Sequence, residues 1–83
     1  MKKTILITHL KKRRETAVKV QKLLTDYGCM IKTRLGIHDG VLDKCSNTGL
    51  IILELVGSVK DKKAFASKLK AIPEVEVKLV NIG

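Results

Sequence analysis

Two histidines and one of the two cysteines are the residues of this chain that could bind a metal ion. They are His9, His38 and Cys45, and Asp39 and Asp43 lie near the last two in sequence. Imidazole and thiolate are ligands suited to zinc, nickel or copper, and an aspartate could complete the set. The spacing is weakly specific, so we favour the simpler interpretation, in which His38 ends a strand and Cys45 is a loop residue.

A run of basic residues is the second candidate site. Lys11, Lys12, Arg13 and Arg14 follow the first apolar segment. Basic side chains at the start of a helix oppose its macrodipole, so they are not expected to stabilise it. They could contact the phosphates of a nucleic acid or a small anion. The alternative, which we favour, is that they form a solvated helical face.

The elements that must position these residues are indicated by changes in the apolar period. Strand patterns cover residues 3–10, 30–38, 49–56 and 75–82, and helical stripes cover residues 11–27 and the segment from Ser58 to Ile72. Ser58 and Asp61 form an S-x-x-D helix start, and Pro73 follows the helix. One domain, residues 1–83, is expected.

The order βαββαβ predicts an α+β, ferredoxin-like sandwich, in which a four-stranded antiparallel sheet of order 4-1-3-2 carries both helices on one face. This topology places His9, His38 and Cys45 at the same end of the sheet, which keeps the metal hypothesis open. Cys29 is expected at the opposite end, packed in the structure.

The third strand, GLIILELV, is apolar on both faces. Leu50, Ile52 and Val56 point away from the face that the helices can cover, whereas a solvated sheet face normally shows polar alternation. An exposed apolar patch usually meets a partner, so we expect a homo-oligomer, a dimer or tetramer, formed through the open sheet face or the sheet edges. The alternative is that neighbouring long side chains shield the patch.

Composition disfavours several functions. Seventeen Lys and Arg against eight Asp and Glu give a net charge of +9, which is typical of proteins that bind polyanions. RNA recognition on this fold needs aromatic side chains on the central strands, but the single Tyr and single Phe lie in the predicted helices. No helix-turn-helix precedes the first strand, so binding to nucleic acid is an alternative that we disfavour.

Neither an enzyme nor a membrane protein is expected. Small acyl-phosphate hydrolases of this topology carry a Gly-rich loop after the first strand, where this chain has KKRRE, and no nucleophile–base arrangement is visible. No apolar run approaches the ~20 residues of a membrane span, and the short apolar N-terminal stretch lacks the features of a signal peptide. We therefore expect a cytoplasmic protein.

The segments RLGIHDG, CSNTG, LIILELVG and KLKAIPEVEVKLV together resemble the ACT-like family named as iron-only hydrogenase system regulators, over essentially the whole chain. The resemblance implies a ferredoxin-like fold related to the regulatory domain of nickel-responsive repressors, pairing through sheet edges or faces, and small effectors bound at interfaces. Of the repressors' nickel ligands, only His38 and Cys45 have counterparts here. We thus expect a non-enzymatic regulatory or effector-sensing module that acts as an oligomer. A basic nucleic-acid-associated protein and a zinc or nickel sensor are the alternatives.

Overall fold

The helices and strands begin and end close to where the apolar period changes. The computed structural model describes residues 3–38 and 47–83. Its elements are β1 (Lys3–Leu10), α1 (Arg13–Asp26), a 3-10 turn η1 (Gly28–Met30), β2 (Ile31–His38), β3 (Gly49–Leu55), α2 (Val59–Lys70) and β4 (Val75–Ile82).

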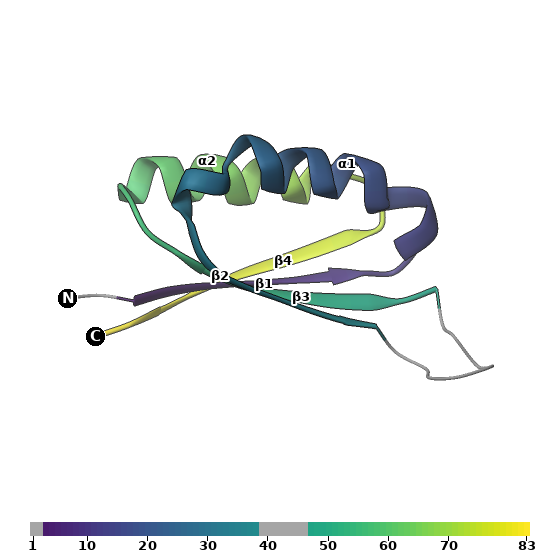
Figure 1. The fold of residues 1–83 in the computed structure, drawn as a ribbon, viewed down its shortest axis with the longest axis horizontal. Helices are drawn as coiled ribbons and strands as arrows, with labels where there is room; N and C mark the ends of the chain where they lie inside the picture. Colours follow the sequence, from purple (N-terminus) through teal and green to yellow (C-terminus); the bar gives the residue numbers. More distant parts are fainter. Residues whose placement is uncertain (1–2, 39–46) are drawn as a thin grey trace.

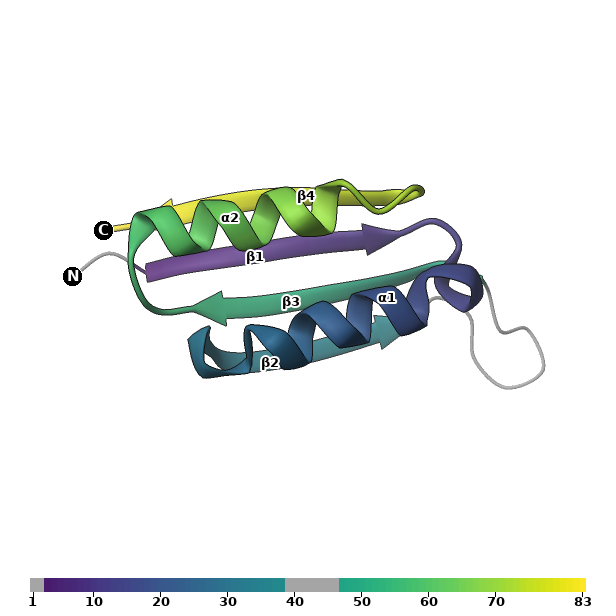
Figure 2. The ribbon, with the colours of Figure 1, turned by 90° about the horizontal axis from the view of Figure 1, so that it is seen from above.

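The strands form one antiparallel sheet in the order β2-β3-β1-β4. This is the predicted order 4-1-3-2 read from the other edge, so the ferredoxin-like topology is confirmed. Figure 1 shows both helices on one side of the sheet and no described element on the other. Figure 2 shows that α1 lies over β2 and β3, and that α2 lies over β1 and β4.

The core lies between the sheet and the helices. Alternate residues of the central strands are buried there, which is why β1 and β3 show burial of period 2. Burial of one large apolar side chain contributes about 1.5–3 kcal/mol, so this layer is the main source of stability. The core residues are Leu6, Leu10, Val20, Leu24, Ile51, Leu53, Leu55, Phe65, Leu69, Ile72 and Val75.

The two helices start in different ways. The hydroxyl of Ser58 accepts a hydrogen bond from the Asp61 amide at 3.1 Å, which confirms the predicted start of α2. Helix α1 begins at Arg13, two residues later than predicted, and its N-cap residue Lys12 makes no side-chain cap. The group that caps α1 instead comes from a distant part of the chain and is described below.

The end of α1 differs from the prediction. The helix stops at Asp26, and Gly28 begins the 3-10 turn that leads into β2. In this turn Cys29 is a free, exposed thiol, so the expectation that it packs in the structure is wrong. No helix in the described part of the chain is long and apolar enough to cross a membrane.

Candidate functional site

The uncovered face of the sheet carries a continuous apolar surface, which we call the open face. Strand registers place side chains from all four strands on it, with Ile52 between Ile7 of β1 and Leu35 of β2. Leu35 is 52% exposed and Ile82 is 59% exposed, on strands at opposite edges of the sheet. The apolar members of the open face are Ile5, Ile7, Leu35, Ile37, Leu50, Ile52, Val80 and Ile82.

The edge strand β2 explains why this surface is so apolar. Its residues Leu35 and Ile37 face away from the helices, while Arg34 and Gly36 lie on the covered side. Strand β2 thus turns its apolar side chains to the uncovered face of the sheet, whereas a strand under a helix usually turns them towards the helix. Apolar side chains of three neighbouring strands therefore meet on the open face.

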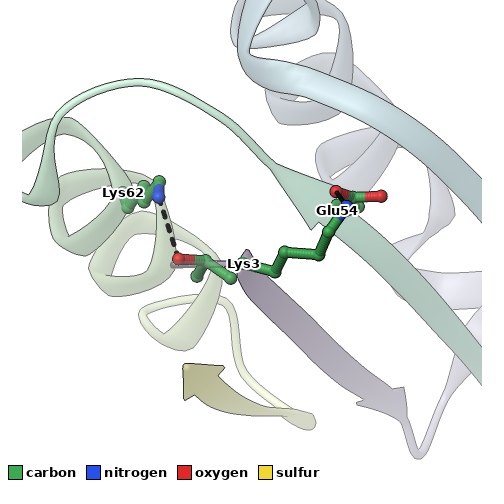
Figure 3. Close-up of polar contacts among 4 residues, drawn as sticks. Lys3, Glu54 and Lys62 are labelled. Carbon is green, nitrogen blue, oxygen red and sulfur yellow. Dashed lines mark hydrogen bonds and ion pairs between the residues drawn. The ribbon is translucent and has the colours of Figure 1, made fainter. Parts of the chain in front are cut away.

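Ion pairs flank the apolar surface along β1. At one end, Lys3 Nζ lies 3.4 Å from Glu54 Oε2, across β1 and β3 (Figure 3). At the other end, His9 Nδ1 and Lys11 Nζ lie 3.3 Å and 3.6 Å from the carboxylate of Glu76. The hydrogen bond with His9, followed by the charge of Lys11, lowers the pKa of Glu76.

The two layers of the sandwich differ in charge. On the open face, Lys3 and Lys78 are balanced by Glu54 and Glu76. On the helical layer, α2 carries five lysines and one aspartate, and α1 carries four basic and two acidic residues. The positive charge of the protein is thus concentrated on the helical layer.

A cavity lies under α1, between the helix and the strands β2 and β3. Its volume is about 320 Å³. The buried core residues Leu10, Val20 and Ile51 line it, and so do the basic residues Arg13 and Arg34. We call it the α1 cavity; its lining residues are Leu10, Arg13, Ala17, Val20, Gln21, Arg34, Gly36, Ile37, Gly49, Leu50 and Ile51.

Two contacts set the position of the arginines in the α1 cavity. Arg34 Nη2 donates a hydrogen bond to Gln21 Oε1 at 2.5 Å, which links β2 to the middle of α1. Arg13 packs its aliphatic chain against Gly49, where an added Cβ would lie only 2.9 Å from Arg13 Cδ. Glycine at position 49 therefore allows Arg13 to lie close to the strand.

Asn47 anchors the start of α1 to the residues that lead into β3. Its carbonyl accepts the Arg13 amide at 2.6 Å and its Oδ1 accepts the Arg14 amide at 2.9 Å. Its Nδ2 donates to Glu15 Oε2 at 2.9 Å, and this hydrogen bond lowers the pKa of Glu15. One side chain thus satisfies a helix amide and fixes an acidic residue of the first turn.

The four predicted basic residues do not form one cluster. Lys11 pairs with Glu76 on the β4 side, while Lys12 and Arg14 are exposed. Arg13 is partly buried and lines the α1 cavity, which Arg34, a residue that the sequence did not single out, also lines. The available signal in the sequence was Gly36. A glycine within a strand often marks a place where a ligand or another part of the chain approaches the backbone.

The predicted metal ligands are only partly within the described residues. His9 lies opposite Leu50 and contacts Glu76, and His38 ends β2 opposite Gly49. The backbones of His9 and His38 are two strands apart, which corresponds to roughly 10 Å. Cys45, Asp39 and Asp43 lie outside the described residues. Among the side chains that the structure describes, those of residues 3–37 and 47–83, no three His, Cys, Asp or Glu gather as metal ligands, and the metal site stays a prediction.

Comparison with known proteins gives structural likeness only. No family model and no curated protein matches the chain. The uncharacterized protein TM1266 from Thermotoga maritima is similar over the full length of both chains, with a TM-score of 0.83 and 27% identity.

Two more distant structures share the fold. The apo form of CPII from Thiomonas intermedia K12, a nitrogen regulatory PII-like protein, has a TM-score of 0.63 and 15% identity, over 99% of this chain and 90% of its own. A dimeric ferredoxin-like protein from an uncultured marine organism has a TM-score of 0.53 and 8% identity, over 98% and 92%. These likenesses support the small ferredoxin-like fold.

Proposed function

We propose that this protein is a non-enzymatic, ACT-like regulatory module that self-associates through the open face and responds to a small effector. The observation that carries the proposal is the open face itself, which is apolar in its middle and balanced in charge along its length. The similarity of the fold to a PII-like regulatory protein and to a dimeric ferredoxin-like protein supports it. The family resemblance adds support for a role in regulation.

A second copy of the chain is the occupant that the charges favour. Two copies of a protein with a net charge of +9 repel each other unless they meet through a neutral surface. The open face offers such a surface, since its lysines and glutamates are equal in number, while the helical layer does not. Pairing through the open face therefore keeps the two basic helical layers apart.

The size of the open face suits a modest association. Four strands at ~4.8 Å spacing and about eight residues of ~3.3 Å each give a flat face of roughly 19 Å by 26 Å. The area of this face is smaller than the area that one partner buries in a standard interface. A standard interface buries about 800 Å² per partner. We therefore expect association that depends on protein concentration.

The α1 cavity and the open face share residues. Ile37 and Leu50 belong both to the lining of the α1 cavity and to the open face. A small molecule that shifts these strand segments would change the surface that the second copy meets. The proposal therefore includes an effector that changes the strength of self-association.

The test is sedimentation equilibrium of the wild type and of variants with one added lysine. Leu35→Lys on β2 and Ile82→Lys on β4 place a charge on the open face at opposite edges, and both should weaken association at least tenfold. Val18→Lys, at an 81% exposed position of α1, is the matched control and should leave association unchanged. A wild type that stays a single copy at high concentration would refute the proposal. Association reduced by only one open-face variant would instead indicate pairing through that sheet edge.

The basic helical layer favours a second candidate function, an association with nucleic acid. The lysines of α2, together with the exposed Lys11, Lys12 and Arg14, could neutralise phosphates, and such binding weakens steeply with salt. Fluorescence anisotropy with a labelled duplex at 50 mM and 200 mM salt (about the range over which the loss is large) measures this directly. Replacement of those three residues by Gln should reduce the affinity, and a wild-type protein that does not bind at the lower salt concentration would exclude this function.

A further inference from the structure

We propose that the outer edge of β4 binds an extended acidic segment of another protein, which adds to the sheet as a further strand beside β4. The side chains of this segment that face the helices lie in a groove between α2 and β4. The inference goes beyond the proposed function, because it needs neither the open face nor the α1 cavity.

The groove between α2 and β4, which we call the β4 groove, has a volume of about 300 Å³. Its lining residues are Lys63, Ala66, Ser67, Lys70, Val77 and Leu79. The helical residues among them are spaced i, i+3, i+4 and i+7, so they form one stripe along α2. No described residue of β1 lines the groove, although β1 is the neighbour of β4 in the sheet. The β4 groove therefore lies at the outer edge of the sheet, where β4 is the last strand (Figure 2).

The outer edge of β4 offers main-chain groups for pairing. Because β4 is an edge strand, alternate residues direct their N–H and C=O groups away from β1. The whole of β4, Val75–Ile82, pairs with β1 without a register shift, and no proline interrupts it. The other edge strand, β2, has a register shift between Ile31 and Thr33. Such an irregularity disfavours pairing, so β4 is the edge that is better suited to accept a further strand.

The charge of the β4 groove indicates an acidic partner. Lys63 and Lys70 are exposed at opposite ends of the helical stripe, and no described acidic residue lines the groove. Neither lysine forms an ion pair with a carboxylate in the described part of the chain, so both ammonium groups are available to a partner. When a strand is added to a sheet edge, main-chain hydrogen bonds supply affinity and side-chain contacts supply specificity. The two lysines therefore select carboxylates.

A second copy of this chain does not suit the edge of β4. Helix α2 lies over β1 and β4 and carries five lysines and one aspartate. If two copies paired through β4, their α2 helices would lie on the same side of the extended sheet, with the two β4 grooves next to each other. Lys63 and Lys70 of both copies would then repel one another. The edge thus favours a partner that brings negative charge.

The geometry of the β4 groove sets the spacing of the acidic residues in the partner. Lys63 and Lys70 are separated by roughly 10 Å along α2. In an extended segment alternate residues face the same side, and residues four positions apart are about 13 Å from each other. Two acidic residues with this spacing come within reach of the two long lysine side chains. The residue midway between them faces the partly buried Val77 and Leu79, where an apolar side chain fits.

The experiment is an NMR titration of the full chain with synthetic peptides. The test peptide, STETVTETS, places a glutamate on each side of a valine with the predicted spacing, and STQTVTQTS is its neutral control. A second control, STEPPTETS, keeps both glutamates but carries two adjacent prolines, one of which removes an amide that must point at β4. We expect saturable binding of the test peptide with slower hydrogen exchange at alternate amides of β4. Both controls should bind at least tenfold more weakly.

Charge reversal on the protein tests the two lysines. Lys63→Glu combined with Lys70→Glu should weaken binding of the test peptide about tenfold or more. This double variant should instead bind the lysine peptide STKTVTKTS, which also shows that it is folded. The control, Lys19→Glu combined with Lys60→Glu, makes the same change of net charge at exposed positions outside the β4 groove. It should change the affinity for the test peptide less than threefold.

Four results would overturn the inference. The first is the absence of a saturable response to STETVTETS. The second is equal binding of the proline peptide, which would show that no strand is added. The third is equal weakening by the two double variants, which would reflect general charge. The fourth is slow exchange at the same β4 amides in the protein alone, increasing with its concentration, which would show that a second copy occupies the edge.

Discussion

At the residue scale, the chemistry of this protein depends on which way each side chain points. Four consecutive basic residues look alike in sequence, but only Arg13 turns into the α1 cavity. Thr4 and Thr8 are likewise both buried on the covered face of β1. The Thr4 hydroxyl has hydrogen-bond partners, whereas the Thr8 hydroxyl has none among the described residues. Such differences support predictions about single atoms.

Thr8→Val should stabilise the protein by about 1 kcal/mol. The Thr8 hydroxyl is fully buried and has no hydrogen-bond partner among the described residues, and burial of an unsatisfied hydroxyl is costly. The measurement is urea denaturation of the wild type and the variant.

Thr4→Val is the matched control and should have the opposite effect. The Thr4 hydroxyl donates to Asn81 Oδ1 and accepts from Lys62 Nζ, each at 2.8 Å. Loss of these bonds should destabilise the protein by about 1 kcal/mol or more. If Thr8→Val also destabilised the protein, the Thr8 hydroxyl would have a hydrogen-bond partner in solution.

His9→Ala should raise the pKa of Glu76 towards its ordinary value of 4.5, because the hydrogen bond with His9 is the largest cause of its depression. Lys11→Gln should raise this pKa by less, since the charge of Lys11 is the second cause.

The same change should appear in the pH dependence of stability. A carboxyl group whose pKa is lower in the folded state contributes stability above its unfolded-state pKa, and this contribution is lost as pH falls through the folded-state pKa. The difference between wild type and His9→Ala should therefore be present above about pH 4.5 and disappear in acid. NMR titration of the Glu76 carboxyl group checks the order of the two variants, and an unchanged pKa in His9→Ala would contradict it.

At the element scale, α1 depends on a residue outside itself. Asn47 binds two amides of the first turn and the carboxylate of Glu15, so the position of the helix is tied to the start of β3. Because α1 also forms one wall of the α1 cavity, the same anchor fixes the place of Arg13. The helix start is thus both a structural and a functional element.

Asn47→Ala should destabilise the protein by about 1 kcal/mol, the usual effect of losing a helix cap. The pKa of Glu15 should rise, because the hydrogen bond from Asn47 is the main cause of its depression. Thermal unfolding and NMR titration measure the two effects. Asn47→Asp retains an acceptor for the Arg14 amide but not the donor to Glu15, so it should lose less stability than Asn47→Ala. Equal losses would show that the cap contributes little.

The fold was predictable because the spacing of the apolar residues in each element is typical of either a strand or a helix. The alternation in β3, the stripe of α2 and the Ser58–Asp61 start are local signals, and the order βαββαβ leaves few topologies. The α1 cavity was not predictable in this way. Arg13 and Arg34 line the same cavity because of the register of β2 with β3 and the rotation of α1. The spacing of the two residues in the sequence reveals neither. The cap by Asn47 was missed for the same reason, since its partners lie more than thirty positions away.

At the scale of the whole molecule, the protein has one basic layer and one apolar layer. Burial of the open face against a second copy would add stability to a chain whose size limits its own core. Folding is then linked to association by mass action. The stability of this protein should therefore depend on its concentration.

The melting temperature of the wild type should rise with protein concentration, while that of Leu35→Lys should rise much less. Differential scanning calorimetry over a hundredfold range of concentration measures this, with Val18→Lys as the control that keeps the dependence. A wild type whose melting temperature does not change with concentration would contradict assembly through the open face.

The arrangement of the two layers also determines what an assembled pair would look like from outside. If the sheets meet, the exposed lysines of both α2 helices lie on opposite outer surfaces. Such a particle would be cationic on both sides and could bridge two polyanions, which a single copy with one cationic side cannot do. Self-association and contact with nucleic acid would then reinforce each other.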